Sequence, residues 1–315
     1  MGRQPWAVIL AGGEGSRLKS LSRFIAGDDR PKQFCALFGG KTLLGRTRAR
    51  VARAIPPHQT LFVVVKRHEP YYRSELGELD PSRIVVQPAN AGTTAAILYS
   101  LLRLSRLDED PIVAFFPTDH DYADEFRFTQ AVQTAVEAAA DYPEDLILLG
   151  AEADRPEEQY GWIEPGPPLS GDPSRGSLVR VNRFREKPSS WVARELFNRG
   201  CLWNTFVVVG RAQTFLDVLQ SAAPSVCGAF EELKSMPEGE AEWECASRIY
   251  AGGLSGDFSH DVLAASTGRL AVLALGNAGW SDLGTPERVR AVADSKARAW
   301  LRGAENNSAR SPGLC

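Results

Sequence analysis

The sequence has little of what builds thiolate metal sites, disulfide frameworks or membrane spans. The 5 cysteines in its 315 residues form no C-x-x-C pair and are widely scattered, at Cys35, Cys201, Cys227, Cys245 and Cys315. No apolar run reaches the roughly 18 residues that cross a bilayer, and the run after residue 5 is too short for a secretory signal. We therefore expect a cytoplasmic protein that does not bind membranes.

The sequence also lacks a large excess of charge of either sign. Its formal net charge of -3 gives no general attraction to nucleic acid, so we expect no nucleic-acid partner. A polyanionic ligand must then meet a local cluster of cations, which suits a small phosphorylated molecule. No Ser-His-Asp or Cys-His arrangement stands out among the 4 histidines. An enzyme of this kind would depend on alignment and charge neutralisation.

Short apolar runs alternate with segments of helical length. Strands are expected at residues 6–10, 61–65, 84–86, 112–116, 146–149, 205–209 and 270–275, and the clearest helices at 93–107 and 128–140. This alternation predicts an α/β fold, a Rossmann-like, mostly parallel sheet flanked by helices. After residue 150, a loop-rich stretch at 156–177 and an alternating strand at 178–188 indicate a β-rich extension, followed by a helical region at 212–250.

A glycine-rich loop, AGGEGSR at residues 11–17, follows the first expected strand. It therefore lies at the carboxyl edge of the sheet, where open α/β folds bind ligands, and its glycines let backbone amides close on phosphate oxygens. The dinucleotide fingerprint is incomplete because Leu18 replaces its third glycine, and GGKT at 39–42 lacks a phosphate-loop glycine at Cys35. Arg17 and Lys32 follow in an order suited to neutralising phosphates, although a plain tight turn is the alternative.

Seven segments, in order along the chain, resemble those of sugar-1-phosphate nucleotidyltransferases. PKQF in particular is similar to the mannose-1-phosphate guanylyltransferases. The segments are AGGEGSR with RPKQF at 11–34, QPANAGTTAA at 87–96, FFPTDHD at 115–121, YGWIEPG at 160–166, FREKP at 184–188, WNTF at 203–206 and GWSDLGT at 279–285. One such match could arise by chance, whereas seven in sequence point to the family.

The resemblance implies transfer of a nucleotidyl group from GTP to mannose 1-phosphate, giving GDP-mannose and pyrophosphate. Another base, hexose or heptose remains open. Arg17 and Lys32 would grip the triphosphate, and Lys187 would bind the sugar phosphate. The remaining nucleotide-binding residues are expected to be Ala11, Gly12, Gly13, Gly15, Gln87, Gly92 and Thr93. A plain helix N-cap is the competing role for Thr93.

The sugar-phosphate side and the metal ligands also follow from the resemblance. The residues matched to the sugar side are Gly161, Glu164, Glu186 and Asn204, beside Lys187. Asp119 and Asp282 each come after an expected strand, and two carboxylates beside a triphosphate would hold Mg²⁺, which takes one or two protein carboxylates. A turn or capping role is the alternative for either aspartate.

The domain organisation follows the same matches. We expect one catalytic domain over residues 1–290, with a nucleotide-binding half at 1–150 and a sugar-phosphate-binding half at 151–290. Residues 291–315 should form a C-terminal helix and a frayed tail. A homo-oligomer is compatible with the sequence, which does not specify the oligomeric state.

Two departures from the family pattern and two rival functions accompany this prediction. The segment at 18–31 is longer than usual, with Ser20 where proline is common, so it is expected to be more mobile or to carry an extra contact. Phe206 stands where a small glycine is expected.

The two rival functions are a metal-dependent glycosyltransferase that uses Asp119, His120 and Asp121 as a D-x-D site, and a noncatalytic nucleotide-sugar sensor.

Overall fold

A central sheet of nine strands organises the computed structural model, which describes residues 4–169 and 178–308. Its order is β3-β2-β1-β4-β9-β6-β10-β8-β7, and a separate two-stranded sheet pairs β11 with β5. The strands are β1 (Trp6–Leu10), β2 (Thr60–Val65), β3 (Ile84–Gln87), β4 (Ile112–Pro117), β5 (His120–Tyr122), β6 (Leu146–Glu152), β7 (Gly161–Pro168), β8 (Leu178–Glu186), β9 (Leu202–Arg211), β10 (Leu270–Ala274) and β11 (Trp280–Asp282).

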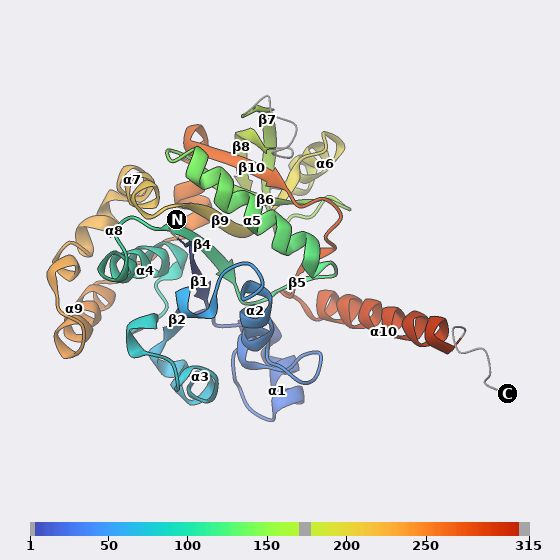
Figure 1. The fold of residues 1–315 in the computed structure, drawn as a ribbon, viewed down its shortest axis with the longest axis horizontal. Coiled ribbons are helices and arrows are strands. Elements are labelled where there is room, and N and C mark those ends of the chain that lie inside the picture. Colours follow the sequence, from blue (N-terminus) through green and yellow to red (C-terminus); the bar gives the residue numbers. More distant parts are fainter. Residues whose placement is uncertain (1–3, 170–177, 309–315) are drawn as a thin grey trace.

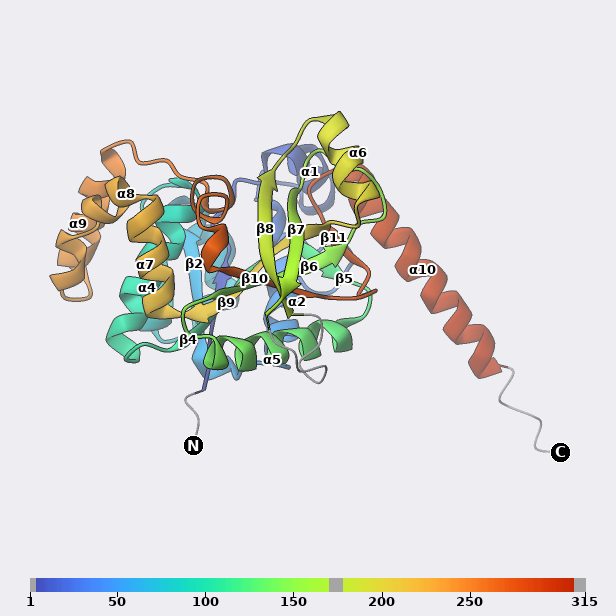
Figure 2. The same cartoon turned by 90° about the horizontal axis from the view of Figure 1, so that it is seen from above.

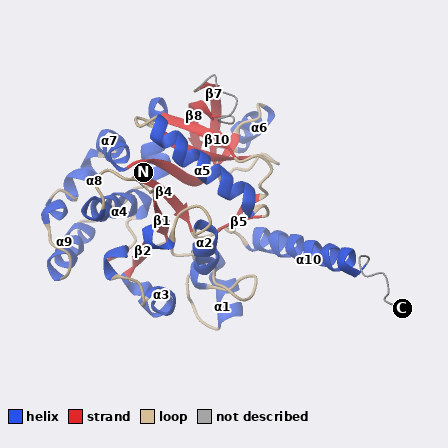
Figure 3. Ribbon diagram, in the orientation of Figure 1, coloured by secondary structure: helices blue, strands red, loops and turns tan. Residues whose placement is uncertain are grey.

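The central sheet runs mostly in one direction. β3, β2, β1 and β4 are mutually parallel, β10 is parallel to β6, and only β9 and β8 run against the others. The parallel strands β3, β2, β1 and β4 come from residues 6–117, and the strands beyond them in the sheet come from residues 146–274. Figure 3 shows the strands in red with helices around them. The predicted α/β class, with its β-rich extension, is confirmed.

Helices cover both faces of the sheet because its strands are apolar on both sides. In β1, Trp6 and Val8 belong to one core cluster, whereas Ala7 and Ile9 belong to another. Figure 1 shows α4, α7, α8 and α9 gathered on one side. The helices are α1 (Lys19–Ala26), α2 (Leu43–Val51), α3 (Glu69–Leu76), α4 (Gly92–Leu107), α5 (Glu125–Asp141), α6 (Ser190–Asn198), α7 (Ala212–Ala222), α8 (Pro224–Ala229), α9 (Glu240–Ala251) and α10 (Pro286–Ser308).

Three expected loops contain regular structure. The stretch at 156–177 includes β7, which pairs with β8 and β9, although its residues 170–177 lie outside the described part. The lengthened segment at 18–31 contains α1 rather than only loop, and Arg23 binds Asp29 across its end. The expected tail is helical through Ser308, and the fraying expected beyond it falls on residues 309–315, which are not described.

The last helix, α10, leaves the body of the molecule, as both views show (Figures 1 and 2). Its first turns still belong to the fold. Val289 is buried in a small core with Leu18, Leu43 and Leu283, and Val292 packs against that core. Across residues 4–169 and 178–308, no helix combines the length and the apolarity that a bilayer span requires.

Candidate active site

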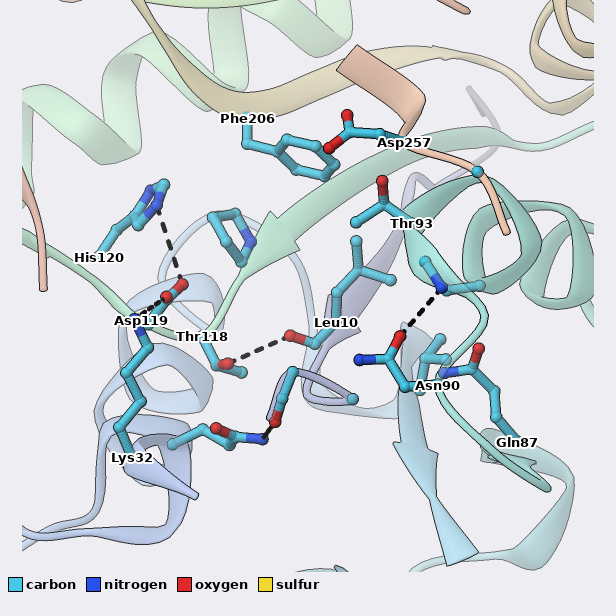
Figure 4. Close-up of a pocket in the computed structure, with 18 of the residues that line it drawn as sticks. Leu10, Lys32, Gln87, Asn90, Thr93, Thr118, Asp119, His120, Phe206 and Asp257 are labelled. Atoms are coloured by element: carbon cyan, nitrogen blue, oxygen red, sulfur yellow. Dashed lines mark hydrogen bonds and ion pairs between the residues drawn. The ribbon is translucent and has the colours of Figure 1, made fainter. Parts of the chain in front are cut away.

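A cavity of about 510 Å³ opens at the carboxyl edge of the parallel strands (Figure 4). The loop after β1, the residues after β4 and the start of α4 all reach it, because parallel strands end at the same edge of a sheet. Its lining includes Gly12, Gly13, Lys32, Gln33, Gln87, Asn90, Gly92, Thr93, Thr118, Asp119, His120, Phe206 and Asp257. The cavity therefore gathers segments that lie more than 200 residues apart in the sequence.

The glycine loop is held in place by the segment that carries Lys32. Gln33 is buried, and its amide nitrogen donates to the carbonyl oxygens of Ala11 at 3.0 Å and Gly13 at 2.7 Å. Gly15 has φ of 61°, and a Cβ there would come within 2.9 Å of the Lys32 backbone nitrogen. Only glycine fits this close approach, so the loop and the Lys32 segment form one unit.

Lys32 and Asp119 meet in the cavity. Lys32 Nζ lies 2.5 Å from Asp119 Oδ2 and donates to the Leu283 carbonyl oxygen at 3.1 Å. Burial raises the pKa of Asp119, but the neighbouring charge of Lys32 outweighs it and holds the pKa well below its usual range. The carboxylate is therefore ionised at neutral pH and paired with a cation in a largely enclosed place.

His120 lies beside this pair and is neutral. Its Nε2 is 3.8 Å from Asp119 Oδ1, and its Nδ1 accepts a hydrogen bond from Trp280 Nε1 at 3.2 Å. Burial lowers the pKa of His120, and the nearby carboxylates of Asp119 and Asp282 oppose that effect. Asp121, the last residue of the Asp-His-Asp segment, is buried and pairs with two other cations, Arg46 at 3.4 Å and Lys296 at 2.9 Å.

The far end of the cavity carries Gln87 and the start of α4. Gln87 is buried, and Tyr250 in α9 donates its hydroxyl hydrogen to Gln87 Oε1 at 2.9 Å, which leaves the amide nitrogen on the cavity side (Figure 4). Gly92 has φ of 86° and forms an isolated bridge with Gly256. Thr93 is not the N-cap: α4 is capped by Ala91, and Thr93 Oγ1 accepts from the Phe258 backbone nitrogen at 2.8 Å.

Three residues expected on the sugar side come together next to the cavity. A Cβ at Gly161 would lie 2.7 Å from Glu186 Oε2 and 3.2 Å from the Cβ of Asn204. Burial raises the pKa of Glu186, and Lys187, whose Nζ is 2.9 Å from Glu186 Oε1, lowers it. Asn204 is buried; its Oδ1 accepts from the Phe206 nitrogen at 3.0 Å.

Asp282 lies on the strand beside Asp119. The Leu283 nitrogen donates to the Asp119 carbonyl oxygen at 2.8 Å, and β11 pairs with β5 so that Asp282 faces His120. The side chain uses Oδ1 for two donors, the Tyr160 hydroxyl at 2.5 Å and an Arg288 nitrogen at 2.7 Å. Asp119 lines the cavity and Asp282 does not, although their segments adjoin, and each carboxylate has one oxygen engaged by a cation.

Several predicted site residues, Asp282 among them, lie outside the cavity lining, and three of these contact groups remote from the expected ligand. Arg17 is exposed, and its guanidinium donates to Gln159 Oε1 at 3.0 Å. Lys187 has a side chain 57% exposed and a positive φ of 45°. Glu164 is paired with Arg199 at 2.5 Å. Their proposed contacts with phosphate or sugar stay predictions.

Four residues that shape the site were missing from the sequence prediction. Gln33 could have been predicted, because it belongs to the PKQF segment that resembles the family and directly follows Lys32. Asp257 lines the cavity and caps the short helix Phe258–Leu263, accepting from the Ser259 and His260 nitrogens. Tyr250 contacts Gln87, and Arg288 contacts Asp282. Both are tertiary contacts, which a local sequence pattern does not predict.

The chain matches the sequence profile of the family described as "Nucleotidyl transferase" over residues 6–298. The xanthan biosynthesis protein XanB of Xanthomonas campestris pv. campestris (strain B100) is 30% identical over 282 residues, which cover 88% of this chain and 57% of that protein. The mannose-1-phosphate guanylyltransferase RfbM of Salmonella typhimurium is 32% identical over 230 residues, which cover 71% of this chain and 46% of that protein.

A solved structure from Thermus thermophilus, described as a mannose-1-phosphate geranyltransferase, has the same fold. It superposes with a TM-score of 0.76 at 30% identity, covering 89% of this chain and 76% of that chain. The chain spans about half the length of the curated relatives it matches.

Proposed function

Because the chain belongs to the nucleotidyl transferase family, we propose that it transfers a nucleotidyl group from a nucleoside triphosphate to a sugar 1-phosphate. The proposed substrates are GTP and mannose 1-phosphate, and the products are GDP-mannose and pyrophosphate. The similarity to RfbM, which is named a mannose-1-phosphate guanylyltransferase, supports this choice of base and sugar. Residues 1–150 would bind the nucleotide, and residues 151–290 would bind the sugar phosphate.

The observation that carries the proposal is the meeting of Lys32 and Asp119 in one cavity with the glycine loop. A glycine loop whose backbone can approach phosphate oxygens, beside the partly enclosed cation of Lys32, suits a triphosphate. Gln33 ties this loop to the Lys32 segment, so the parts keep a fixed relation before the substrate binds. Such preorganised charges stabilise a transition state without reorganisation during the reaction.

In the proposed reaction, an oxygen of the sugar phosphate attacks the α-phosphorus of the nucleotide. A bond forms between that oxygen and phosphorus, and the bond to the oxygen that bridges the α- and β-phosphates breaks, releasing pyrophosphate. A phosphate monoester has its second pKa near 6 and is largely dianionic at neutral pH, so no general base is required. Lys32 would stabilise the charge that passes to pyrophosphate, and the neutral His120 would leave Asp119 free of a second cation.

The donor set of the site fits Mg²⁺. Asp119 and Asp282 lie on adjoining segments and provide hard carboxylate oxygens, the ligands that Mg²⁺ prefers, while substrate phosphates and water complete its shell. In the described residues no group of three or more His, Cys, Asp or Glu side chains could hold a metal by itself, which suits an ion shared with a substrate. When bound, it would neutralise and align the phosphate oxygens.

The rival D-x-D function requires Asp121 to act with Asp119. Asp121 is instead paired with Arg46 and Lys296, so its carboxylate is neutralised within the fold. This arrangement favours a nucleotidyltransferase over a glycosyltransferase that uses both aspartates. A noncatalytic sensor would keep the cavity but would not release pyrophosphate.

The experiment that tests the function is a grid of four nucleoside triphosphates against mannose, glucose and heptose 1-phosphates with Mg²⁺, with pyrophosphate release as the readout. We expect the fastest release with GTP and mannose 1-phosphate, and none after chelation of Mg²⁺. If no pair yields pyrophosphate, or if the protein instead frees a nucleoside diphosphate from a nucleotide sugar, the proposal is wrong.

A further inference from the structure

Phe206, within β9, has a backbone conformation that its side chain disfavours. Its φ of 59° lies in the left-handed region, which residues other than glycine, asparagine and aspartate rarely adopt. Among the described residues, the only other non-glycine residues with positive φ are Asp110 and Lys187. A strained residue persists only where the surrounding structure fixes it, and such residues concentrate at functional sites.

The strain arises from a bulge that turns Phe206 out of the ladder. Asn204 is opposite Gly150 and Val208 is opposite Leu148, so three residues of β9 face one residue of β6. Side-chain hydrogen bonds hold this bulge: Thr205 Oγ1 donates to the Leu149 carbonyl oxygen at 2.7 Å, and Asn204 Oδ1 accepts from the Phe206 nitrogen at 3.0 Å. Bulges of this kind re-aim a side chain.

The aromatic ring of Phe206 is aimed at the cavity. Phe206 is only partly buried, and it lines the cavity together with Thr93, His120 and Asp257. Figure 4 shows the ring near Asp257 and Thr93, across the cavity from Lys32. One edge rests on the Phe258 ring, with centroids 6.3 Å apart, which limits where the ring can move. The fold thus accepts local strain and places a bulky, supported group in the site.

We propose that Phe206 is a specificity-determining residue that limits the size of the sugar 1-phosphate. The inference rests on the proposed function. The Phe206 nitrogen donates to Asn204 Oδ1, and Asn204 lies next to Gly161 on the expected sugar side. The backbone of Phe206 therefore adjoins the sugar side while its ring enters the cavity. Because the ring takes up part of the cavity, the site would favour hexose 1-phosphates with plain hydroxyl groups over bulkier ones, and a sugar with a 2-acetamido group serves as the bulkier probe.

Two substitutions separate the ring from the strain. Phe206→Ala removes the ring and keeps a side chain at positive φ, whereas Phe206→Gly removes both. We expect both variants to raise the ratio of kcat/KM for N-acetylglucosamine 1-phosphate to that for mannose 1-phosphate by at least about tenfold, the scale of steric discrimination in a pocket. The KM for GTP should stay within about twofold of the wild-type value.

A matched control is Asp110→Gly, which changes another positive-φ residue, one that does not line the cavity. It should leave the substrate ratio unchanged. Phe206→Leu keeps apolar bulk and should give an intermediate ratio of the two kcat/KM values. Thermal melting shows whether the alanine and glycine variants fold, and if they do not, the leucine variant provides the test.

The outcomes distinguish this inference from the function on which it rests. If the wild-type protein releases no pyrophosphate with any substrate pair, the proposed function itself is wrong. An active wild type whose Phe206 variants keep the same substrate ratio, or lose affinity for GTP instead, overturns only the role of Phe206.

Discussion

Several parts of the cavity are each held in position by one neighbouring side chain before any substrate binds. Gln33 holds the glycine loop through the carbonyl oxygens of Ala11 and Gly13, and Lys32 holds Asp119. Tyr250 holds Gln87 from α9, and both side chains are buried. A buried hydrogen bond of this kind sets which end of the Gln87 amide faces a ligand, because the two ends differ in donor and acceptor character.

Replacing Tyr250 with phenylalanine tests this positioning. The change keeps the aromatic packing against Phe230 but removes the hydroxyl donor to Gln87 Oε1. One hydrogen bond contributes about 0.5 to 1.5 kcal/mol, so we expect the KM for GTP to rise by about twofold to tenfold with little change in kcat. Steady-state pyrophosphate release at varied GTP concentration measures both.

The control for this change is Tyr99→Phe, because Tyr99 is also buried and packs against the same Phe230 ring. Its KM for GTP should match that of the wild type. An equal rise in both variants would mean that loss of any buried hydroxyl in this part of the core, rather than loss of the Gln87 contact, weakens binding.

At the scale of elements, α10 is joined to the site by its first turns. Arg288 donates to Asp282 Oδ1 at 2.7 Å, lies 2.9 Å from Glu157 Oε2 and has its guanidinium 4.4 Å from the centre of the Tyr160 ring. The side chains of Arg288, Asp282 and Glu157 are only 10 to 16% exposed. Arg288 thus pairs with two enclosed carboxylates, one of which also contacts Arg155, and joins the start of the helix to the strand that carries Asp282.

Removing that cation should destabilise the fold. Arg288→Met leaves Asp282 enclosed without its cation and Glu157 with only Arg155, at 3.4 Å, and breaking a buried ion pair costs about 3 kcal/mol or more. We expect a loss of about this size in the free energy of unfolding by urea. Because Asp282 is a proposed metal ligand, Mg²⁺ should recover more stability in this variant than in the wild type.

The exposed Arg290, two residues along the same helix, provides the matched control. Arg290→Met should change the unfolding free energy by less than about 0.5 kcal/mol, as exposed substitutions do. A similar small change for Arg288→Met would contradict the proposed docking of α10.

The elements that the sequence failed to predict are those without a local apolar signal. β5 and β11 are three residues each, and Trp280 pairs with Tyr122 from more than 150 positions away. Neither segment has the alternation or length that marks a strand, so only tertiary pairing forms them. The longer apolar runs at 6–10 and 112–116 did predict β1 and β4, because they are buried on both faces.

For the whole molecule, parallel topology explains how much of the site could be predicted. Asp119 was expected at the same sheet edge as the glycine loop because each follows a strand of the parallel sheet, and Lys32 was placed beside the loop by its order in the sequence; Lys32 and Asp119 meet there. The turning of Arg17 toward Gln159 and the pairing of Asp282 with Arg288 depend on side-chain geometry between distant segments. Hydrophobic periodicity and motif spacing do not predict side-chain contacts of this kind.

A buried histidine makes the stability of the whole molecule depend on pH. His68 is 3% exposed and packs edge-on against Phe34, with ring centroids 5.9 Å apart. Burial, aided by Arg67, lowers the pKa of His68 from 6.5 to about 4. The unfolded chain therefore takes up a proton more readily than the folded chain between these values, and acidification favours unfolding.

The stability contribution of His68 is complete above about pH 6.5 and is lost as pH falls toward about 4. Between pH 7.5 and 5.5, we expect the free energy of unfolding to fall by about 1.4 kcal/mol from this group. Urea unfolding at the two pH values measures it. His68→Gln should remove this loss, whereas His58→Gln, at an exposed position, should keep it; equal pH dependence in all three proteins would contradict the assignment.

The most direct test of the central claim concerns Lys32, the cation that joins the glycine loop to Asp119. The measurement is kcat for pyrophosphate release by Lys32→Ala at saturating GTP and mannose 1-phosphate, with the exposed Lys41→Ala as control. Loss of one preorganised electrostatic contact predicts a fall of about two to three orders of magnitude for Lys32→Ala and none for Lys41→Ala. Near-normal turnover of Lys32→Ala would contradict the account.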